Sequence, residues 1–189
     1  SYSLVFIKGL FPKCKKNILK INLSVNTTLN NNLKKNYITC MPRKLPSHFF
    51  LLQFYLQNKI PKNWKIDIID NVSKKELLNK LKRSKIFLSF SHFEGLGLPP
   101  LEAALTGNKV IGYIGGGAKE YWKKPIFNKI EYGEISKFGN RILKEIDIYN
   151  DNWVKKTEAT RNQLAKKYSK IAEKKSLIDL SNKIIEFFK

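Results

Sequence analysis

Short apolar runs alternate with stretches of helical spacing through most of this chain. A short apolar run between turn residues is typical of a buried strand, and apolar residues three and four positions apart indicate a helix. The predicted strands are Ile18–Val25, Tyr37–Cys40, Trp64–Ile69, Ile86–Phe90, Val110–Ile114 and Pro125–Ile130. The predicted helices are Phe49–Asn58, Ser73–Arg83 with Ser73 as its cap, Pro99–Thr106, Ala118–Trp122, Ile135–Tyr149 and Val154–Phe188, the last interrupted near Ser176.

From Tyr37 onward, strands and helices alternate with short connections. This order predicts an α/β fold, in which one Rossmann-like parallel sheet has helices on both faces. We expect this domain, with its C-terminal helices, at residues 36–189. Residues 1–35 are expected to form a lead-in strand and an Asn-rich linker. The chain begins at Ser1 in mid-pattern, and we expect it to be a piece of a longer protein.

The stretch from Phe87 to Glu102, FLSFSHFEGLGLPPLE, places seven residues between two carboxylates. Glu94 follows an apolar strand, and Glu102 lies in the helix that comes next. Gly95 and Gly97 let the backbone approach a ligand closely, and the N–H groups at the start of a helix favour a phosphate. Carboxylates can accept hydrogen bonds from sugar hydroxyls. The combination predicts a nucleotide-sugar site; the alternative is a plain strand-to-helix turn with two solvated glutamates.

The segment from Ser84 to Tyr121, SKIFLSFSHFEGLGLPPLEAALTGNKVIGYIGGGAKEY, resembles the donor-binding half of the two-Rossmann-domain (GT-B type) glycosyltransferases. The similarity is to the large family that includes glycogen and sucrose-phosphate synthases. That family carries a Glu-x7-Glu pair, a glycine, a strand, and a Gly-Gly turn with a Glu, matched here by Gly107, Val110–Ile114 and Gly115–Glu120. The close match covers about a fifth of the chain. It implies that the chain is the C-terminal half of a GT-B fold.

The resemblance also implies roles for individual residues. Glu94 would lie beside the donor sugar as a catalytic residue, and Glu102 would hold the ribose hydroxyls. Arg43 and Lys44 occupy the loop where the family places a basic pair that neutralises the diphosphate. In the family, however, the Arg follows a Gly and the Lys comes several residues later, and a solvated loop is the alternative here. Glu120 could reach the crevice, but a surface charge is the simpler interpretation. The other predicted donor-binding residues are Ser91, His92, Gly95, Leu96, Gly97, Leu98 and Gly116.

The chain carries 36 basic and 15 acidic residues, which gives a formal net charge of +21. Such an excess favours phosphate-bearing or anionic partners. The candidates are a nucleoside diphosphate, an anionic membrane surface and nucleic acid; a lysine-rich genome would also explain the charge without any ligand. The lysines are spread along the chain and few residues are Arg. Because nucleic-acid binders concentrate their charge and interleave aromatics, we do not expect nucleic acid as a partner.

Cysteine and histidine usage argues against a metal or disulfide framework. Cys14 and Cys40 are the two cysteines and form no Cys-x-x-Cys pair, which fits a reducing compartment. His48 and His92 lack zinc-ligand spacing, and solvated or turn-capping roles suit Asp67 and Asp70 better than metal binding. No apolar run reaches the roughly 20 residues needed to span a bilayer. We therefore expect no cofactor and no metal, in line with the metal-independent transfer that the resemblance implies. We also expect a cytoplasmic protein with peripheral contact to the inner face of the membrane.

These observations predict the donor-binding domain of a glycosyltransferase. The enzyme would move a sugar from a nucleoside diphosphate sugar to a hydroxyl acceptor, with retention, in surface polysaccharide or glycolipid synthesis. The acceptor, a glycan or lipid-linked sugar, would bind a preceding N-terminal domain, so the isolated domain should bind donor and catalyse poorly. Two alternatives are a non-catalytic nucleotide-binding or interaction module of the same fold, and another nucleotide-sugar enzyme such as an epimerase.

Overall fold

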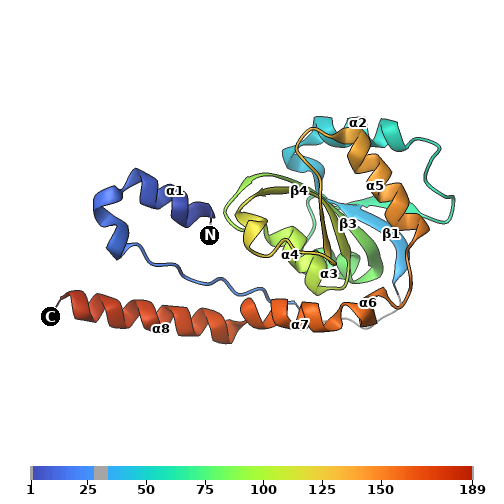
Figure 1. Cartoon of the computed structure of the whole chain (residues 1–189). Helices are drawn as coiled ribbons and strands as arrows, with labels where there is room; N and C mark the ends of the chain where they lie inside the picture. Colours follow the sequence, from blue (N-terminus) through green and yellow to red (C-terminus); the bar gives the residue numbers. More distant parts are fainter. Residues whose placement is uncertain (1, 28–33, 189) are drawn as a thin grey trace.

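A five-stranded parallel sheet forms the centre of the computed structural model, which describes residues 2–27 and 34–188 (Figure 1). The strands are β1 (Lys35–Cys40), β2 (Lys65–Ile68), β3 (Ser84–Glu94), β4 (Lys109–Gly116) and β5 (Phe127–Lys129). Their order across the sheet is β2-β1-β3-β4-β5, and each neighbouring pair is parallel. The direction of winding therefore reverses between β1 and β3, which is where open α/β sheets bind ligands.

Helices cover both faces of the sheet. Alternate residues of β3 serve two separate cores, with Ile86 and Leu88 on one face and Phe87 on the other. The first face is covered by α2 (Pro46–Leu56) and α5 (Ile135–Asp147), and the second by α3 (Lys74–Arg83), α4 (Leu98–Leu105), α6 (Trp153–Lys156) and α7 (Glu158–Lys167). This arrangement confirms the predicted Rossmann-like α/β domain.

All five strands predicted from Tyr37 onward are present, and β3 and β4 extend further than predicted. The predicted strand at Ile18–Val25 was wrong, because these residues are extended but have no sheet partner. The predicted break at Ser176 was also wrong. The predicted final helix is interrupted instead at Thr157 and again at Tyr168 and Ser169. The Ser169 side chain caps the last helix by accepting from the backbone N–H of Ala172.

Two further predictions need qualification. The helix predicted over Ala118–Trp122 is a 3-10 turn, η3, at Gly117–Glu120. The predicted Asn-rich linker falls mainly on residues 28–33, which lie outside the described residues.

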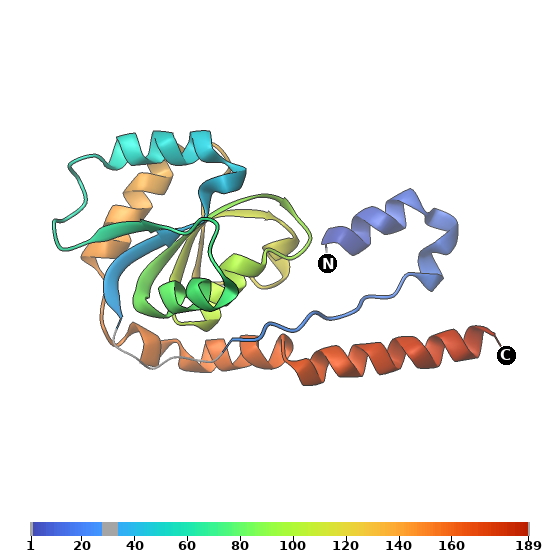
Figure 2. The same cartoon turned by 180° about the vertical axis from the view of Figure 1, so that it is seen from behind.

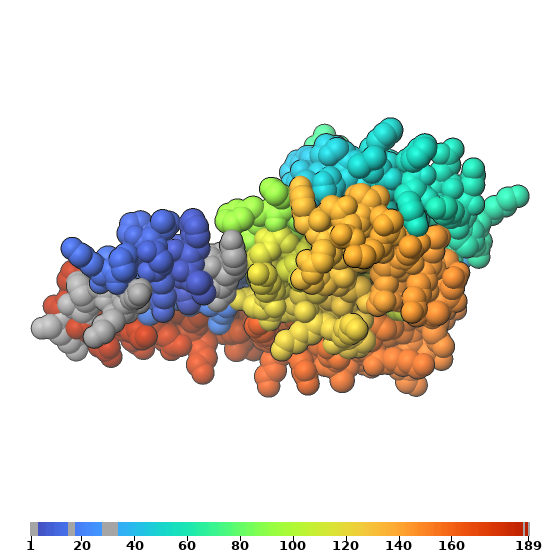
Figure 3. Space-filling view, turned by 45° about the horizontal axis from the view of Figure 1, so that its top comes forward, coloured from blue at the N-terminus to red at the C-terminus, as the bar shows by residue number. Residues whose placement is uncertain are grey.

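The two ends of the described chain project together from the sheet domain (Figures 1 and 2). One part comprises α1 (Tyr2–Leu10), the 3-10 turn η1 (Pro12–Asn17) and the extended segment to Thr27; the other is α8 (Lys170–Phe187). We call residues 2–27 and α8 the terminal arm. The backbone N–H of Asn22 donates to Ser176 Oγ at 3.0 Å, and the segment therefore runs along α8. Figure 3 shows the blue and red elements of the arm outside the rounded sheet domain.

Candidate functional site

A cavity of about 250 Å³ opens at the carboxyl edge of the sheet, between β1 and β3. The loop after β1, the end of β3 and the first turn of α4 supply its walls, because parallel strands place all these connections at the same edge. The lining residues are Met41, Arg43, Lys44, Phe87, Ser89, Phe90, Ser91, Glu94, Pro99 and Pro100. The three predicted catalytic residues, Arg43, Lys44 and Glu94, are therefore brought together in this cavity.

Lys44 and Glu94 form an ion pair across this cavity. The Lys44 Nζ to Glu94 Oε1 distance is 3.0 Å, and the side chains are 53% and 15% exposed. Lys44 lies in the 3-10 turn η2 (Pro42–Lys44) that directly follows β1, which places its ammonium over the end of β3. Lys44 therefore has a charged partner at the cavity, while its side chain stays more than half exposed. The arrangement puts a cation next to the carboxylate and leaves the Arg43 guanidinium on the same wall.

The loop that carries Glu94 is held by close backbone packing. β3 and β4 remain paired as far as Glu94 and Gly116. A Cβ added to Gly117 would lie 2.1 Å from the carbonyl oxygen of Gly95, so only glycine fits this approach. The Tyr121 hydroxyl donates to the carbonyl oxygen of Gly97 at 2.6 Å. Burial raises the pKa of Tyr121, which keeps its hydroxyl protonated as the donor.

Glu102 lies one helical turn after the start of α4 and does not line the cavity. Its side chain is 5% exposed, and it pairs with Lys74 at the start of α3. The neighbouring Leu101 and Ala103 are fully buried, which fixes α4 against the sheet. A buried carboxylate is costly unless it is paired and hydrogen-bonded. Glu102 is therefore not a solvated surface charge, because it is buried and paired with Lys74.

The remaining predicted donor-binding residues lie at different places around the end of β3. Ser91 is buried in the cavity wall, and its Oγ lies 3.1 Å from Ser89 Oγ. Gly116 lies beside Glu94 in the ladder. His92 points elsewhere: its ring centroid is 5.5 Å from that of Tyr132. Gly95, Leu96, Gly97 and Leu98 form the turn between β3 and α4, with Gly97 buried and the side chain of Leu98 exposed.

Glu120 is not the surface charge that the sequence suggested. It accepts hydrogen bonds from Lys20 Nζ at 2.9 Å and from the Tyr168 hydroxyl at 2.8 Å. Burial pushes the pKa of Glu120 upward, but these hydrogen bonds outweigh burial and hold the pKa below its ordinary value. Glu120 therefore ties the loop after β4 to the terminal arm.

Several groups at this edge have no catalytic chemistry of their own. Burial, with a smaller contribution from Asp67, raises the pKa of the Cys40 thiol to about 12, so no thiolate nucleophile forms at neutral pH. Asp67 itself accepts from Lys80 at 2.7 Å. Within residues 2–27 and 34–188, no group of three or more potential metal-ligating side chains comes together.

Sequence reasoning missed three residues that shape the site: Lys74, Ser89 and Tyr121. Ser89 donates to the carbonyl oxygen of Tyr113 at 2.8 Å and so braces β3 against β4 beside the cavity. Tyr121 stands directly after the predicted Glu120, but nothing in the local pattern connects it to Gly97. Alternation along β3 could have identified Ser89, because it places Phe87, Ser89 and Ser91 on one face.

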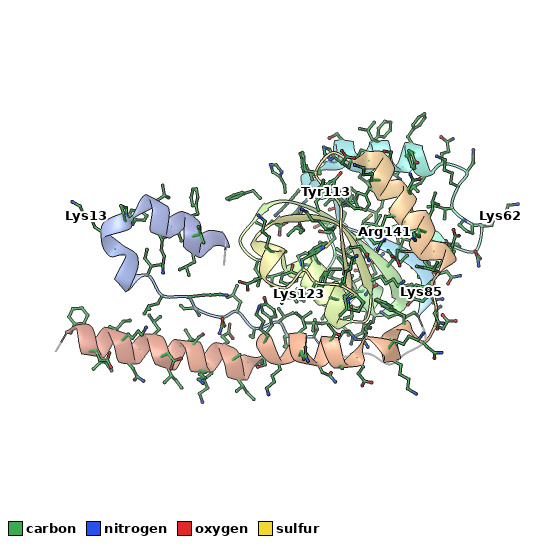
Figure 4. The ribbon with its side chains drawn as sticks, in the orientation of Figure 1. Lys13, Lys62, Lys85, Tyr113, Lys123 and Arg141 are labelled. Carbon is green, nitrogen blue, oxygen red and sulfur yellow. The ribbon has the colours of Figure 1, made fainter. Side chains whose placement is uncertain are left out.

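The basic residues are distributed over the whole molecule. Lys13, Lys62, Lys85 and Lys123, labelled in Figure 4, lie on widely separated elements. Lys85 and Lys109 are largely buried and pair with carboxylates, Lys85 with Asp151. The net charge therefore does not mark one binding face.

No family model matches the chain, and no curated protein sequence matches it. Solved structures do share its fold. An S. aureus TarM G117R mutant in complex with Fondaparinux, alpha-GlcNAc-glycerol and UDP is 16% identical, with a TM-score of 0.70 over 87% of this chain and 39% of that one. The pneumococcal O-GlcNAc transferase GtfA with UDP and GlcNAc is 14% identical, with a TM-score of 0.58 over 84% and 38%. The GtfA/B complex is 14% identical, with a TM-score of 0.57 over 86% and 39%.

At these identities, the shared property is the fold. This fold is a Rossmann-like α/β domain, which the chain shares with these structures. This chain spans well under half the length of each of these three structures.

Proposed function

We propose that this chain is the C-terminal, donor-binding domain of a GT-B glycosyltransferase that uses a nucleoside diphosphate sugar. The observation that carries the proposal is the gathering of Arg43, Lys44 and Glu94 in one cavity at the switch point of the sheet, one helical turn from Glu102. Two structures of the same fold contain UDP, which makes UDP the first nucleotide to test.

We propose that the basic side chains of the cavity assist departure of a diphosphate. Arg43 and Lys44 stand on one wall, and the first turn of α4 presents Pro99 and Pro100 at the other. Positive side chains stabilise charge that develops on a leaving phosphate, whereas Pro99 and Pro100 have no backbone N–H to donate to it. The basic side chains belong to the protein, and we therefore propose that donor binding needs no divalent metal.

Glu94 and Glu102 take different roles in this proposal. Glu94 is in contact with Lys44 and is partly exposed to the cavity, where the sugar would lie. Glu102 is buried behind the first turn of α4, where it would accept from the ribose hydroxyls. We propose retention at the anomeric carbon, because the acidic pair resembles that of retaining enzymes.

The acceptor site would belong to a second domain outside this chain. Many apolar side chains of the terminal arm are exposed, among them Phe6, Leu10 and Ile171. The helix α1 also contacts η3, at the edge of the sheet where the cavity opens. A partner domain that covered the arm would face the cavity and bury this apolar surface. The acceptor would be a glycan or a lipid-linked sugar, and this domain alone would catalyse poorly.

The C-terminal lysines suggest contact with an anionic membrane surface during such synthesis. No described helix is long and apolar enough to cross a membrane. Exposed lysines can be attracted to anionic lipids by up to about 1 kcal/mol each near the surface. The lysines in question are Lys155, Lys156, Lys166, Lys167, Lys174 and Lys175. Sedimentation with vesicles that contain or lack anionic lipid tests this part; equal binding to both at low salt would contradict it.

Calorimetry tests the central proposal. UDP, GDP, ADP and dTDP, and their sugar conjugates, are titrated into the protein in the presence of EDTA. We expect one nucleotide to bind, and Glu102→Ala to weaken it by roughly 1.5–3 kcal/mol while the fold, followed by circular dichroism, is retained. Absence of binding by every member of the panel at millimolar concentration would overturn the proposed function.

A further inference from the structure

Lys74 comes from a part of the chain that the donor motif does not include. It is the first residue of α3, directly after the cap Ser73, and α3 follows β2 rather than β3. Its Nζ nevertheless reaches Oε1 of Glu102 on α4. The Lys74 side chain is 58% exposed and that of Glu102 is 5% exposed, so the lysine lies over the carboxylate from the solvent side.

The position of Lys74 does not serve α3. The positive end of a helix dipole is at its N-terminus, and a cation in the first turn is unfavourable there. The adjacent Lys75 has the same disadvantage, and Glu76 is the acidic residue of that turn. The contact with Glu102 is therefore the feature that explains why an ammonium group stands at this point.

The contact uses one oxygen of the carboxylate. Lys74 holds Oε1, and Oε2 has no hydrogen-bond donor among the residues that the structure describes. An ionised carboxylate accepts at both oxygens, so the pair leaves one acceptor in a fixed direction. Lys74 is also absent from the cavity walls that Arg43 and Lys44 form, which separates it from the groups that would face the diphosphate.

We propose that Lys74 is a positioning residue for nucleotide recognition. By holding Oε1 of Glu102, it fixes the carboxylate so that Oε2 accepts from a ribose hydroxyl of the donor. The inference rests on the proposed function, and it adds a residue of α3 that determines preference for a ribonucleotide over a deoxyribonucleotide. The first glutamate of the pair is held in a similar way, since Lys44 Nζ lies 3.0 Å from Oε1 of Glu94.

The test compares UDP with 2′-deoxy-UDP and 3′-deoxy-UDP by calorimetry on the folded protein. The parent should prefer UDP to at least one deoxy analogue by roughly tenfold, the effect of one hydrogen bond to a charged group. Lys74→Met should remove most of this preference and leave the affinity for that analogue unchanged. Lys74→Arg should keep it, because arginine can also donate to Oε1. Lys75→Met, which changes the adjacent exposed lysine, should behave like the parent.

Other outcomes overturn the inference in distinguishable ways. If Lys74→Met weakens UDP and both deoxy analogues by the same factor, Lys74 attracts the phosphates and does not position Glu102. If the variant matches the parent throughout, the contact has no part in binding. If the parent binds UDP and both analogues equally, the ribose role of Glu102 is wrong although donor binding stands. If the parent binds no nucleotide of the earlier panel, the proposed function fails first and the inference fails with it.

Discussion

Helices α4 and α8 both carry many apolar side chains, but the molecule places them in opposite surroundings. In α4, every residue from Pro100 to Leu105 is buried against the sheet. In α8, Ile171, Leu177 and Ile185 are exposed. The sheet domain therefore positions α4 by packing on its neighbours, whereas polar contacts along one side connect α8 to the rest of the arm. The apolar content of a helix does not by itself decide whether the helix is buried. Burial also requires another part of the protein that packs against its apolar face.

This difference explains where the candidate site lies. Glu94 and Glu102 stand on elements whose backbone is fixed by the β3–β4 ladder and the core beneath α4. Such support is what a binding group needs to hold its geometry. The arm has few buried contacts, and segments of that kind open locally at low free energy. We expect substitutions in the sheet domain to cost much more stability than comparable substitutions in the arm.

The largest contrast is expected between two glycines. Gly112 lies on β4 with a φ of +136°, and a Cβ there would be 2.2 Å from the carbonyl oxygen of Ser89. Gly112→Ala should lower the free energy of unfolding by about 4 kcal/mol, from backbone strain and overpacking together. Gly9 in α1 has open space around it, and Gly9→Ala should cause no loss. Urea denaturation measures both, and similar losses would contradict the comparison.

The second contrast concerns ion pairs. Lys109 Nζ lies 2.5 Å from Glu145 Oε2, and the two side chains are 7% and 5% exposed. Glu145→Gln should destabilise by about 3 kcal/mol, because it leaves a buried ammonium without its counter-charge. The matched change in the arm is Lys20→Ala, which breaks the half-exposed pair with Glu120 and should cost less than about 1 kcal/mol. Equal effects in thermal denaturation would show that burial does not separate the two regions.

Lys34 gives a pH-dependent contrast at the boundary between the two regions. Its ammonium donates to the carbonyl oxygens of Thr106 at 2.6 Å and Leu81 at 3.2 Å. Burial, with a smaller contribution from Arg161, lowers the pKa of Lys34 from 10.5 to about 7. Between those values the unfolded chain holds a proton that the folded chain has lost, so the free energy of unfolding should rise with pH.

The slope should reach at most about 1.4 kcal/mol per pH unit and vanish below pH 7, where both states are protonated. Lys34→Met is the control, since it removes this slope and keeps every other titrating group. The difference between parent and variant, measured by denaturation from pH 6 to pH 10, isolates Lys34. A difference that does not change with pH would mean that Lys34 stays charged in the folded protein.

The sequence was sufficient for much of the sheet domain because its signals are local. Ser73 caps α3 as the Ser-x-x-Glu pattern predicts, accepting from the N–H of Glu76. The predicted order of strand, turn and helix around Glu94 is also present, although β3 continues through Glu94 itself. The pair of Lys74 and Glu102 depends on how α3 and α4 pack over the sheet, 28 residues apart, and no local pattern encodes that. Sequence reasoning failed mostly in the arm. There, Ile18–Val25 alternates like a strand but has no sheet partner.

Ser176 illustrates the same limit. A serine in the middle of an amphipathic stretch suggested a break, but its Oγ donates to the carbonyl oxygen of Glu173 within α8 and accepts from Asn22. A helix can contain such a serine when its hydroxyl bonds to the preceding turn. The role of this residue depended on a segment more than a hundred positions away in sequence.

The smallest expected contrast is between two serines, one in each region. Ser24 in the arm donates to Glu173 Oε2 at 2.7 Å in a partly buried position. Ser84 in the sheet domain is fully buried, where it lies 2.8 Å from Thr39 Oγ1 and also bonds to Asn108. Ser84→Ala should cost roughly 1–3 kcal/mol, because it leaves buried partners unsatisfied. Ser24→Ala should lower the free energy of global unfolding by less than about 1 kcal/mol, since water can replace the lost hydrogen bond. Hydrogen exchange at the amides of the extended arm segment should nevertheless become faster. If Ser24→Ala instead lowers global stability as much as Ser84→Ala does, the arm unfolds together with the sheet domain, and the distinction between the two regions is wrong.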